Sequence, residues 1–206
     1  MKRARKIQAL PQLVDALVDD SRTVYLFFAD LCGSTQYKKL SIAQGQPDIN
    51  WIIRQNVFLQ RCADLVRNYG GVVVKTIGDE LFAYFEATTS SDQVLKCGIE
   101  IVQAFDNIKA YQGPSKLQAK ISIDIGETYN GALSDNVPYD PIGSPVDRCA
   151  RLNDQANSNE IMFSEEFMAK LKGKRSIKRL QEKYAFKLHK EDLQGLGETR
   201  YYCIKA

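Results

Sequence analysis

Two short apolar segments, at residues 72–77 and 81–85, are separated only by residues 78–80, which read Gly-Asp-Glu. Two β-type runs with so short a connection are typical of a β-hairpin. A further β-type run at 23–29 precedes this pair, and residues 117–127 alternate apolar and polar side chains as a half-buried strand does. These four strands restrict the chain to folds that contain an antiparallel sheet.

Two amphipathic helices are predicted between these strands. Residues 48–69 carry apolar side chains at helical spacing and are followed by Gly70-Gly71, which ends the helix. A second helix is predicted over 91–111. The order strand, helix, hairpin, helix, strand matches a ferredoxin-like βαββαβ core. We therefore predict an α+β fold in which helices pack on one face of a mainly antiparallel sheet.

The remaining segments extend this core at both ends. Residues 1–20 are predicted to be a helical appendage, which leaves 21–206 as the main domain. The predicted elements after the core are a helix beginning near Pro145, a strand at 160–164, a short helix at 165–172 and a strand at 199–205. Residues 173–195 are highly charged, and we expect a mobile segment there.

Composition excludes several classes of protein. The net charge is only +3, so no nucleic-acid partner is expected. No apolar run is long enough to span a bilayer, and no signal peptide is present, so no membrane partner is expected either. The five cysteines include no CxxC pair, which favours the reducing cytoplasm. His189 is the single histidine, which excludes mechanisms that need two.

Two aspartates stand at the ends of predicted strands. Asp30 follows the run at 23–29, and Asp79 lies in the hairpin turn. Each residue alone fits a turn or cap role. The residues after Asp30 favour another interpretation, because Gly33, Ser34 and Thr35 form a small loop before a helix, and such a loop binds phosphate. Carboxylates combined with substrate phosphates are the ligands that Mg²⁺ prefers.

Three sequence blocks carry a resemblance to a known family. FADLCGST at 28–35, VKTIGD at 74–79 and GSPVDRCARL at 143–152 resemble the signature blocks of the class III nucleotidyl cyclases, and GLGETRYY at 195–202 resembles their last hairpin. The blocks occur in the family's order from about residue 22 to 203. The resemblance implies that residues 21–206 are a cyclase catalytic domain with a C-terminal hairpin.

The resemblance also implies a role for individual residues. It makes Asp30, Asp79 and the Leu31 carbonyl the ligands of two divalent metal ions, Mg²⁺ or Mn²⁺. It makes Lys75 and Asp140 the residues that read the base of a nucleoside triphosphate. It makes Arg151 the residue that stabilises the transition state, and it places Asp147 where the family has an asparagine. The catalytic sites would be shared across a head-to-tail homodimer.

Departures from the family pattern concern the substrate. Besides Asp147, Pro141 and Ile142 stand where an aromatic residue is common beside the base. The family's triphosphate-binding lysine falls on Leu196, and Lys187, Lys190 and Arg200 are possible substitutes. The short chain and the VDRCAR run resemble the standalone bacterial pyrimidine cyclases of anti-phage (Pycsar) defence. We therefore favour UTP or CTP as the substrate and a separate effector protein as the reader of the cyclic product.

Three alternatives remain. The pair of Lys75 and Asp140 matches the family's adenine-reading pair, which would make the chain an adenylate cyclase. A non-catalytic nucleotide-binding cyclase fold is less favoured, because Asp30 and Asp79 are both present. A ferredoxin-like RNA-binding module would expose aromatic residues on its sheet. The aromatic residues of the predicted strands instead lie in core-like runs: Phe27, Phe28, Phe82, Tyr84 and Phe85.

Overall fold

The computed structural model describes residues 10–105, 116–132, 139–171 and 175–206. The helices in these ranges are α1 (Leu10–Asp19), α2 (Ser34–Ala43), α3 (Ile49–Asn68), α4 (Ser91–Ala104), α5 (Ser144–Gln155), α6 (Glu165–Leu171) and α7 (Arg175–Lys183). The strands are β1 (Arg22–Leu31), β2 (Val72–Ile77), β3 (Glu80–Glu86), β4 (Ala119–Asn130), β5 (Pro141–Ile142), β6 (Glu160–Ser164), β7 (Lys187–Leu193) and β8 (Gly197–Lys205).

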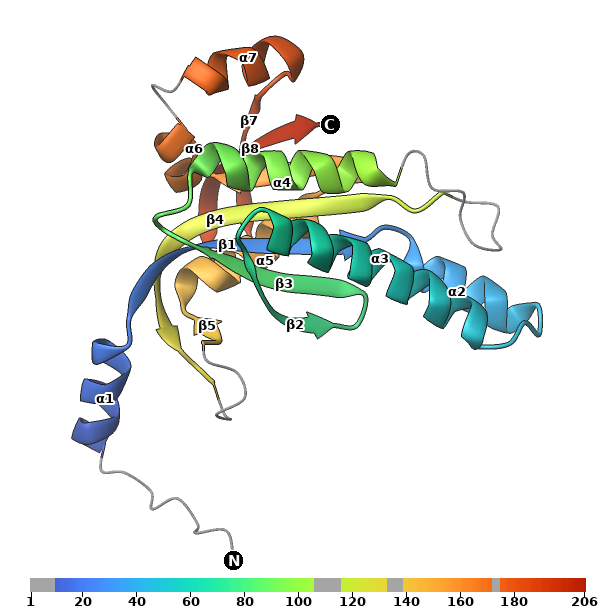
Figure 1. Ribbon diagram of the computed structural model, residues 1–206, viewed down its shortest axis with the longest axis horizontal. Coiled ribbons are helices and arrows are strands. Elements are labelled where there is room, and N and C mark those ends of the chain that lie inside the picture. The colour runs from blue at the N-terminus through green and yellow to red at the C-terminus, as the bar shows by residue number, and fades with distance from the viewer. Residues whose placement is uncertain (1–9, 106–115, 133–138, 172–174) are drawn as a thin grey trace, which may run out of the picture.

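The strands form one sheet in the order β2-β3-β1-β4-β6-β8-β7, and the short β5 pairs with β4 (Figure 1). Neighbouring strands are antiparallel except for β4 and β6, which run parallel. The predicted α+β fold with one mainly antiparallel sheet is therefore confirmed. The central position of β1 places its C-terminal end, with Asp30, beside the β2–β3 turn.

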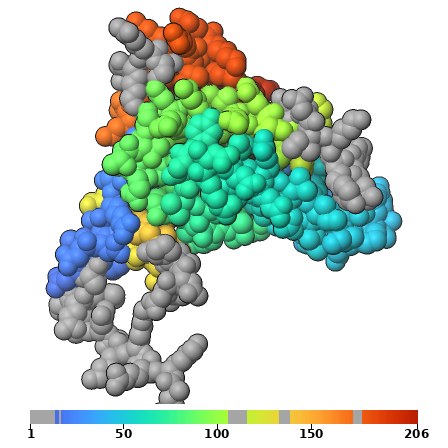
Figure 2. All heavy atoms as spheres, in the orientation of Figure 1, coloured from blue at the N-terminus to red at the C-terminus, as the bar shows by residue number. Residues whose placement is uncertain are grey.

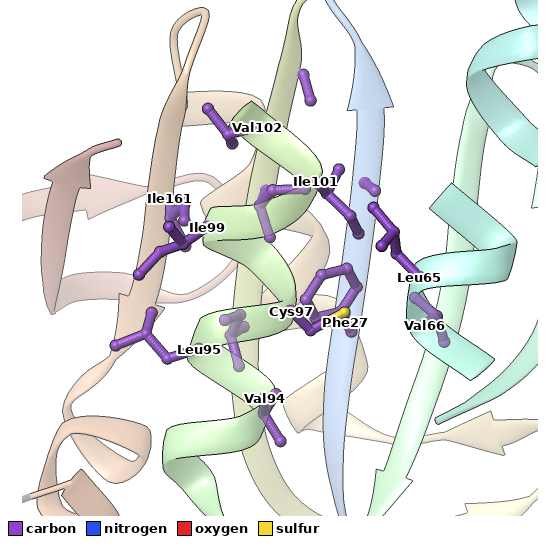
Figure 3. Close-up of a cluster of buried hydrophobic side chains, with 14 of the residues drawn as sticks. Phe27, Leu65, Val66, Val94, Leu95, Cys97, Ile99, Ile101, Val102 and Ile161 are labelled. Atoms are coloured by element: carbon purple, nitrogen blue, oxygen red, sulfur yellow. The ribbon is translucent and has the colours of Figure 1, made fainter. Parts of the chain in front are cut away.

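The main hydrophobic core lies on the face of the sheet that α3 and α4 cover. Alternate side chains of β1, namely Tyr25, Phe27 and Ala29, pack there against both helices. In Figure 3, Phe27 lies beneath α4, and Leu65 and Val66 reach the same cluster from α3. Burying each large apolar side chain stabilises the fold by about 1.5–3 kcal/mol. The two helices of the predicted core thus occupy one face, as expected.

The opposite face is covered by α5, so the expectation of helices on one face only was incomplete. Val24, Leu26 and Phe28 pack on this side with Cys149 of α5. Every residue of β1 from Val24 to Ala29 is almost fully buried. A strand that is apolar without interruption is typical of a sheet covered on both faces. The unbroken run at 24–29 therefore already contained the signal for a second helical layer.

Two contacts fix α5 on the sheet. Arg148 donates hydrogen bonds to both carboxylate oxygens of Asp124 on β4, at 2.7 and 3.0 Å, and the Asp124 side chain is 0% exposed. Pro145, in the first turn of α5, packs directly on Gly126, where a Cβ atom would overlap the proline ring. The backbone of β4 and the start of α5 are therefore in close contact.

The C-terminal region differs from the prediction of a mobile segment at 173–195. The described part of this region contains α7 and β7, and β7 pairs with β8 along its whole length. Ile177 and Tyr184 of this charged region are buried against the main core. A few apolar residues at helical spacing thus outweigh the charges, which lie on the outer side.

The predicted N-terminal helix is present as α1, and residues 1–9 of the predicted appendage lie outside the described part. In the space-filling view α1 extends away from the body of the molecule, and α3 and α4 lie on the face turned toward the viewer (Figure 2). The helix predicted at 91–111 is described to Ala104, and its last part lies outside the described residues. None of the described helices has the length and apolar character needed to cross a membrane.

Candidate active site

Asp30 is the penultimate residue of β1, and its side chain lies on the face of the sheet that α5 covers. Lys120 is paired with it across β4, and the Lys120 Nζ lies 3.1 Å from the Asp30 carboxylate. Burial raises the pKa of the Asp30 carboxyl, the positive charge of Lys120 opposes this rise, and the negative charge of Asp79 adds to it. The two predicted aspartates therefore lie close enough to interact electrostatically.

Asp79 lies in a two-residue turn between the paired residues Ile77 and Glu80. Its neighbour Gly78 has a φ of 64°, a left-handed conformation that tight hairpin turns need and that glycine adopts without strain. From α3, the Gln55 Nε2 donates a hydrogen bond of 2.6 Å to the Gly78 carbonyl. The Gly-Asp turn is thus held in place by the helix behind it.

A hollow of about 260 Å³ separates this turn from the end of β1 and the first turns of α2 and α3. Leu31, Ser34, Thr35 and Asp79 are among the residues that line it. The structure therefore brings two predicted metal-ligand residues and two predicted phosphate-binding residues to one cavity. Gly33, the N-cap of α2 with a left-handed φ of 70°, instead lines a neighbouring hollow of about 410 Å³.

Two basic residues, Lys38 and Arg54, also line this hollow, and the sequence reasoning did not identify them. Lys38 lies one turn after Ser34 on α2, and its Nζ is 4.1 Å from the centre of the Trp51 ring. Arg54 on α3 is 4% exposed. The spacing of four residues between Ser34 and Lys38 could have indicated that both face the same hollow. No sequence pattern could have placed Arg54 there, because it comes from another helix. Both cations favour an anion in the hollow.

The chemistry of the donor set fits a hard divalent cation. Asp30 and Asp79 offer carboxylate oxygens, and the Leu31 carbonyl lies between them in the chain. Among the described residues, no three His, Cys, Asp or Glu side chains lie close enough to hold a metal by themselves. Magnesium sites of this type use one or two carboxylates and complete their coordination with substrate phosphates. The hollow beside Asp79 provides space for such a phosphate.

Glu80 is a further acidic residue at this site that the sequence reasoning missed. It is paired with Asp30 across β1 and β3, so the two carboxyl groups share one face of the sheet. Burial, followed by the negative charge of Asp30, raises the pKa of Glu80 to about 7, and Lys120 opposes the rise. Only the register of β1, β3 and β4 reveals this cluster, and no local sequence pattern fixes that register.

Lys75 and Asp140 meet in the same chain, although they are 65 positions apart in the sequence. The Lys75 Nζ donates hydrogen bonds of 2.6 and 2.9 Å to the two carboxylate oxygens of Asp140. Lys75 is paired with Phe82, and its Nζ lies 5.9 Å from the centre of that ring. The two residues predicted to read the base therefore form one donor–acceptor pair on the surface.

Asp147 and Arg151 both lie exposed on α5, one helical turn apart. The ion pair of Arg151 is with Asp154, at 3.4 Å, rather than with Asp147. Residues at i and i+4 of a helix can form a salt bridge, but Asp147 and Arg151 do not. Since an exposed i,i+3 pair contributes little stability, the Arg151 guanidinium can exchange Asp154 for another anion at low cost.

The β7–β8 turn contains Leu196, which is half-buried against a small apolar cluster beneath α5. Of its suggested substitutes, Lys190 and Arg200 are each ion-paired with a glutamate, at 2.9 and 3.5 Å. Lys187 lines a separate hollow of about 370 Å³ together with His189. β7 forms one edge of the sheet, with β2 at the opposite edge. His189 therefore does not belong to the aspartate site.

The aromatic residues considered for RNA stacking are all buried. Phe28 and Phe82 stack on each other at 4.5 Å under α5, and Phe27 and Phe85 pack edge-to-face on the other side. Tyr84 is also part of the cluster that contains Cys149. Buried rings cannot accept stacked bases, so this arrangement does not fit the RNA-binding alternative.

The fold is that of nucleotide cyclase catalytic domains. The guanylate cyclase domain of RhGC from Catenaria anguillulae, solved in complex with GTP, has a TM-score of 0.72 and 19% identity over 90% of this chain and 97% of that chain. The adenylyl cyclase CyaB from P. aeruginosa has a TM-score of 0.66 and 16% identity over 89% and 94% of the two chains. The structure of adenylate cyclases from Trypanosoma brucei in their monomeric state has a TM-score of 0.72 and 16% identity over 88% of this chain and 89% of that chain.

The family model for the adenylate and guanylate cyclase catalytic domain matches residues 18–206, so the chain belongs to that family. No curated protein sequence matched the chain. Domains of this family are nucleotidyl cyclases that bind a nucleoside triphosphate and generally depend on divalent metal ions. The resemblance deduced from the three sequence blocks is thereby confirmed at the level of the family.

Proposed function

We propose that this protein converts a pyrimidine nucleoside triphosphate, UTP or CTP, into the 3′,5′-cyclic nucleotide and pyrophosphate. The observation that carries the cyclase chemistry is the convergence of Asp30 and Asp79 beside a hollow lined by Ser34 and Thr35. Two carboxylates next to a helix N-terminus and two cations combine metal ligation with phosphate binding. Phosphoryl transfer requires these elements together.

The residues of the chain have distinct tasks in this proposal. Asp30, Asp79 and the Leu31 carbonyl would hold two divalent cations, Mg²⁺ or Mn²⁺. When bound, these ions would lower the pKa of the ribose 3′-hydroxyl and offset charge on the α-phosphate. Gly33, Ser34 and Thr35 would bind phosphate oxygens at the start of α2.

Arg151 would stabilise the phosphoryl oxygens in the transition state, because its planar guanidinium matches phosphate geometry. The weak ion pair with Asp154 at 3.4 Å leaves it available for this task. Asp147 lies on the same helix, where its negative charge would repel the triphosphate unless a cation offsets it. Asp147 would therefore act on the orientation of Arg151 or on a bound cation.

Lys75 and Asp140 would read the base. Their pair presents a donor and an acceptor, and each of the four nucleobases carries an edge with a complementary donor and acceptor. The pair therefore supports base recognition without choosing among bases. The preference for a pyrimidine comes from the VDRCAR run, and ATP is the alternative substrate because the pair matches the family's adenine-reading residues.

A second copy of the chain is part of the proposal. Several apolar side chains on and near the β2 edge are strongly exposed, including Val72, Ile77 and Ile142. Such residues favour coverage by a partner chain. In a head-to-tail homodimer, Asp30 and Asp79 of one protomer would act with Lys75, Asp140 and Arg151 of the other.

We further propose that residues 21–206 form the catalytic domain, with 1–20 as an appendage, and that the cyclic product is a messenger in anti-phage defence read by a separate effector protein. The match of the family to 18–206 supports the division. The resemblance to pyrimidine cyclases supports the role. The site would then act in the cytoplasm.

The test offers ATP, GTP, CTP and UTP separately to the purified full chain with Mn²⁺ or Mg²⁺, and identifies products by mass. We expect cyclic UMP or cyclic CMP. Asp30→Asn should reduce turnover by at least about a hundredfold, since it weakens metal ligation by several kcal/mol. Asp192→Asn, at an exposed position on β7, is the matched control. A preference for ATP would establish the alternative, and no cyclic product from any substrate would refute the enzyme.

A further inference from the structure

Asn130, the last residue of β4, is hydrogen-bonded to the backbone of the predicted base-reading residue. Its Oδ1 accepts from the N–H of Asp140 at 3.1 Å and from the N–H of Ala132 at 3.0 Å. The Asp140 carbonyl in turn accepts a hydrogen bond of 2.8 Å from the N–H of Gly131. Asp140 is therefore held at its amide, its carbonyl and, through Lys75, its carboxylate.

The other end of the Asn130 amide contacts the junction between α1 and β1. Its Nδ2 donates a hydrogen bond of 2.7 Å to one carboxylate oxygen of Asp20, and Arg22 donates to the other oxygen at 3.0 Å. Only this orientation of the Asn130 amide pairs donors with acceptors. In the reversed orientation its NH₂ group would face the two backbone N–H groups, and its oxygen would face the Asp20 carboxylate. The hydrogen bond from Asn130 is also the largest cause that lowers the pKa of Asp20.

A second, independent contact joins the same junction to the residue that precedes Asp140. The Arg22 guanidinium lies 4.4 Å from the centre of the Tyr139 ring, and Tyr139 is 1% exposed. The Tyr139 hydroxyl donates to the Thr128 carbonyl at 2.9 Å, and the Thr128 hydroxyl donates to the Arg22 carbonyl at 3.0 Å. Figure 1 shows α1 and the start of β1 beside the end of the molecule that carries β5.

From these contacts we propose that Asn130 is a positioning residue for base recognition, which sets the place of Asp140 and connects it to Asp20. The inference rests on the proposed function, in which Asp140 reads the base. Asn130 does not touch the substrate. It acts through the backbone of Asp140, and a displacement of Asp20 is transmitted to the base-reading carboxylate through one amide side chain.

A reversal of the hydrogen bond tests this role in the full chain. Asn130→Asp keeps an acceptor for the two backbone N–H groups but sets two carboxylates against each other at Asp20. We expect KM for the preferred nucleotide to rise about tenfold and its discrimination against the other bases to fall, because a hydrogen bond to a charged group is lost. The kcat should change less than twofold, since the metal and phosphate residues are untouched.

The double variant Asn130→Asp with Asp20→Asn restores the contact with donor and acceptor exchanged, and we expect it to recover KM and selectivity. Asp20→Asn alone is the matched control, because its amide oxygen can still accept from Asn130. A merely structural role would lower stability in Asn130→Asp without changing the discrimination among bases. Wild-type KM and selectivity in Asn130→Asp would overturn the proposal, and failure of the double variant to recover would overturn the connection to Asp20.

The equilibrium affinity of each nucleoside triphosphate, measured by calorimetry on the same variants, separates this inference from the proposed function. If the wild type binds nucleotides but forms no cyclic product, the proposed reaction fails, and the role of Asn130 is judged by the same pattern in Kd. If the wild type binds no nucleotide at all, both fail.

Discussion

The Lys120 ammonium lies 3.1 Å from the carboxylate of Asp30, which we propose as a metal ligand. Both side chains are largely buried, and Asp79 and Glu80 add negative charge nearby. In the absence of metal, a lysine therefore supplies the positive charge that this acidic cluster needs.

Removal of that lysine should make the fold depend more strongly on metal. We expect Lys120→Gln to destabilise the metal-free protein by about 1–2 kcal/mol, because a part-buried carboxylate loses its partner. Added Mn²⁺ should then raise Tm more in the variant than in the wild type. Thermal unfolding with and without Mn²⁺ measures both effects, with Lys39→Gln on exposed α2 as the control. An equal Mn²⁺ shift in all three proteins would contradict this view.

Glu80 should make the stability of the metal-free protein fall as pH rises. Its pKa is about 7 in the folded state, against about 4.3 for an unfolded glutamate. Between these values the folded protein holds a proton that the unfolded chain has released. The stabilisation is complete below the unfolded pKa and is lost as pH rises through 7.

Chemical unfolding of the wild type and Glu80→Gln at pH 5 and pH 8 checks this expectation. The wild type should lose on the order of 1 kcal/mol more than the variant over this interval, after allowance for solvent screening. If both proteins showed the same change, Glu80 would not be the responsible group.

Shared active sites predict complementation between inactive chains. Asp30→Asn and Arg151→Ala should each be nearly inactive alone. After random exchange of protomers, half of the dimers are mixed and each has one intact site, so about a quarter of the wild-type activity should return. Product formation by the mixture measures it. Activity no greater than the sum of the separate proteins would argue for a site built within one chain.

The pair of Lys75 and Asp140 should control base selectivity more than turnover. In Asp140→Asn the amide offers a donor as well as an acceptor, so bases of either polarity can bind. We expect the ratios of kcat/KM among the four nucleotides to change by about tenfold, as for the loss of one polar contact. Glu191→Gln, on exposed β7, is the matched control. Unchanged ratios would exclude Asp140 from the base site.

The buried ion pair beneath α5 should be essential unless both partners are replaced. Arg148→Met leaves Asp124 without its cation in a site that is 0% exposed, and we expect a loss of about 3–5 kcal/mol. The combination with Asp124→Leu should recover most of it. Urea unfolding measures the series, with Arg179→Met on exposed α7 as the control. A double variant as unstable as Arg148→Met would show that the pair itself stabilises the fold.

The order of the elements was predictable because each arises from a local pattern. Predicting the hairpin at Gly78 and Asp79 requires only its turn residues and the apolar runs beside them. Predicting the helix before Gly70 requires only the helical spacing of its apolar residues. The covering of both sheet faces was missed, although the unbroken run of β1 indicated it. The segment at 173–195 was misjudged because its many charges hide the few buried residues, such as Ile177.

The candidate site was predictable only where its residues lie in contiguous blocks. Asp30, Ser34 and Asp79 belong to such blocks, and the structure brings them together. The neighbours Lys120 and Glu80 depend on strand register, which no local pattern specifies. The contact between Lys75 and Asp140 joins β2 to the segment before β5. The family resemblance gave the two residues a common role, but neither it nor periodicity predicted their ion pair.

The close contact of Gly126 with Pro145 has a consequence for the sequences of relatives. Any side chain at 126 would push the proline, and with it the start of the helix that carries Arg151, away from the sheet. A glycine at this point of β4 and a compact residue at the start of α5 should therefore change together during evolution. In relatives that lose the glycine, we expect this helix to begin at another place and the arginine that corresponds to Arg151 to lie in a different position.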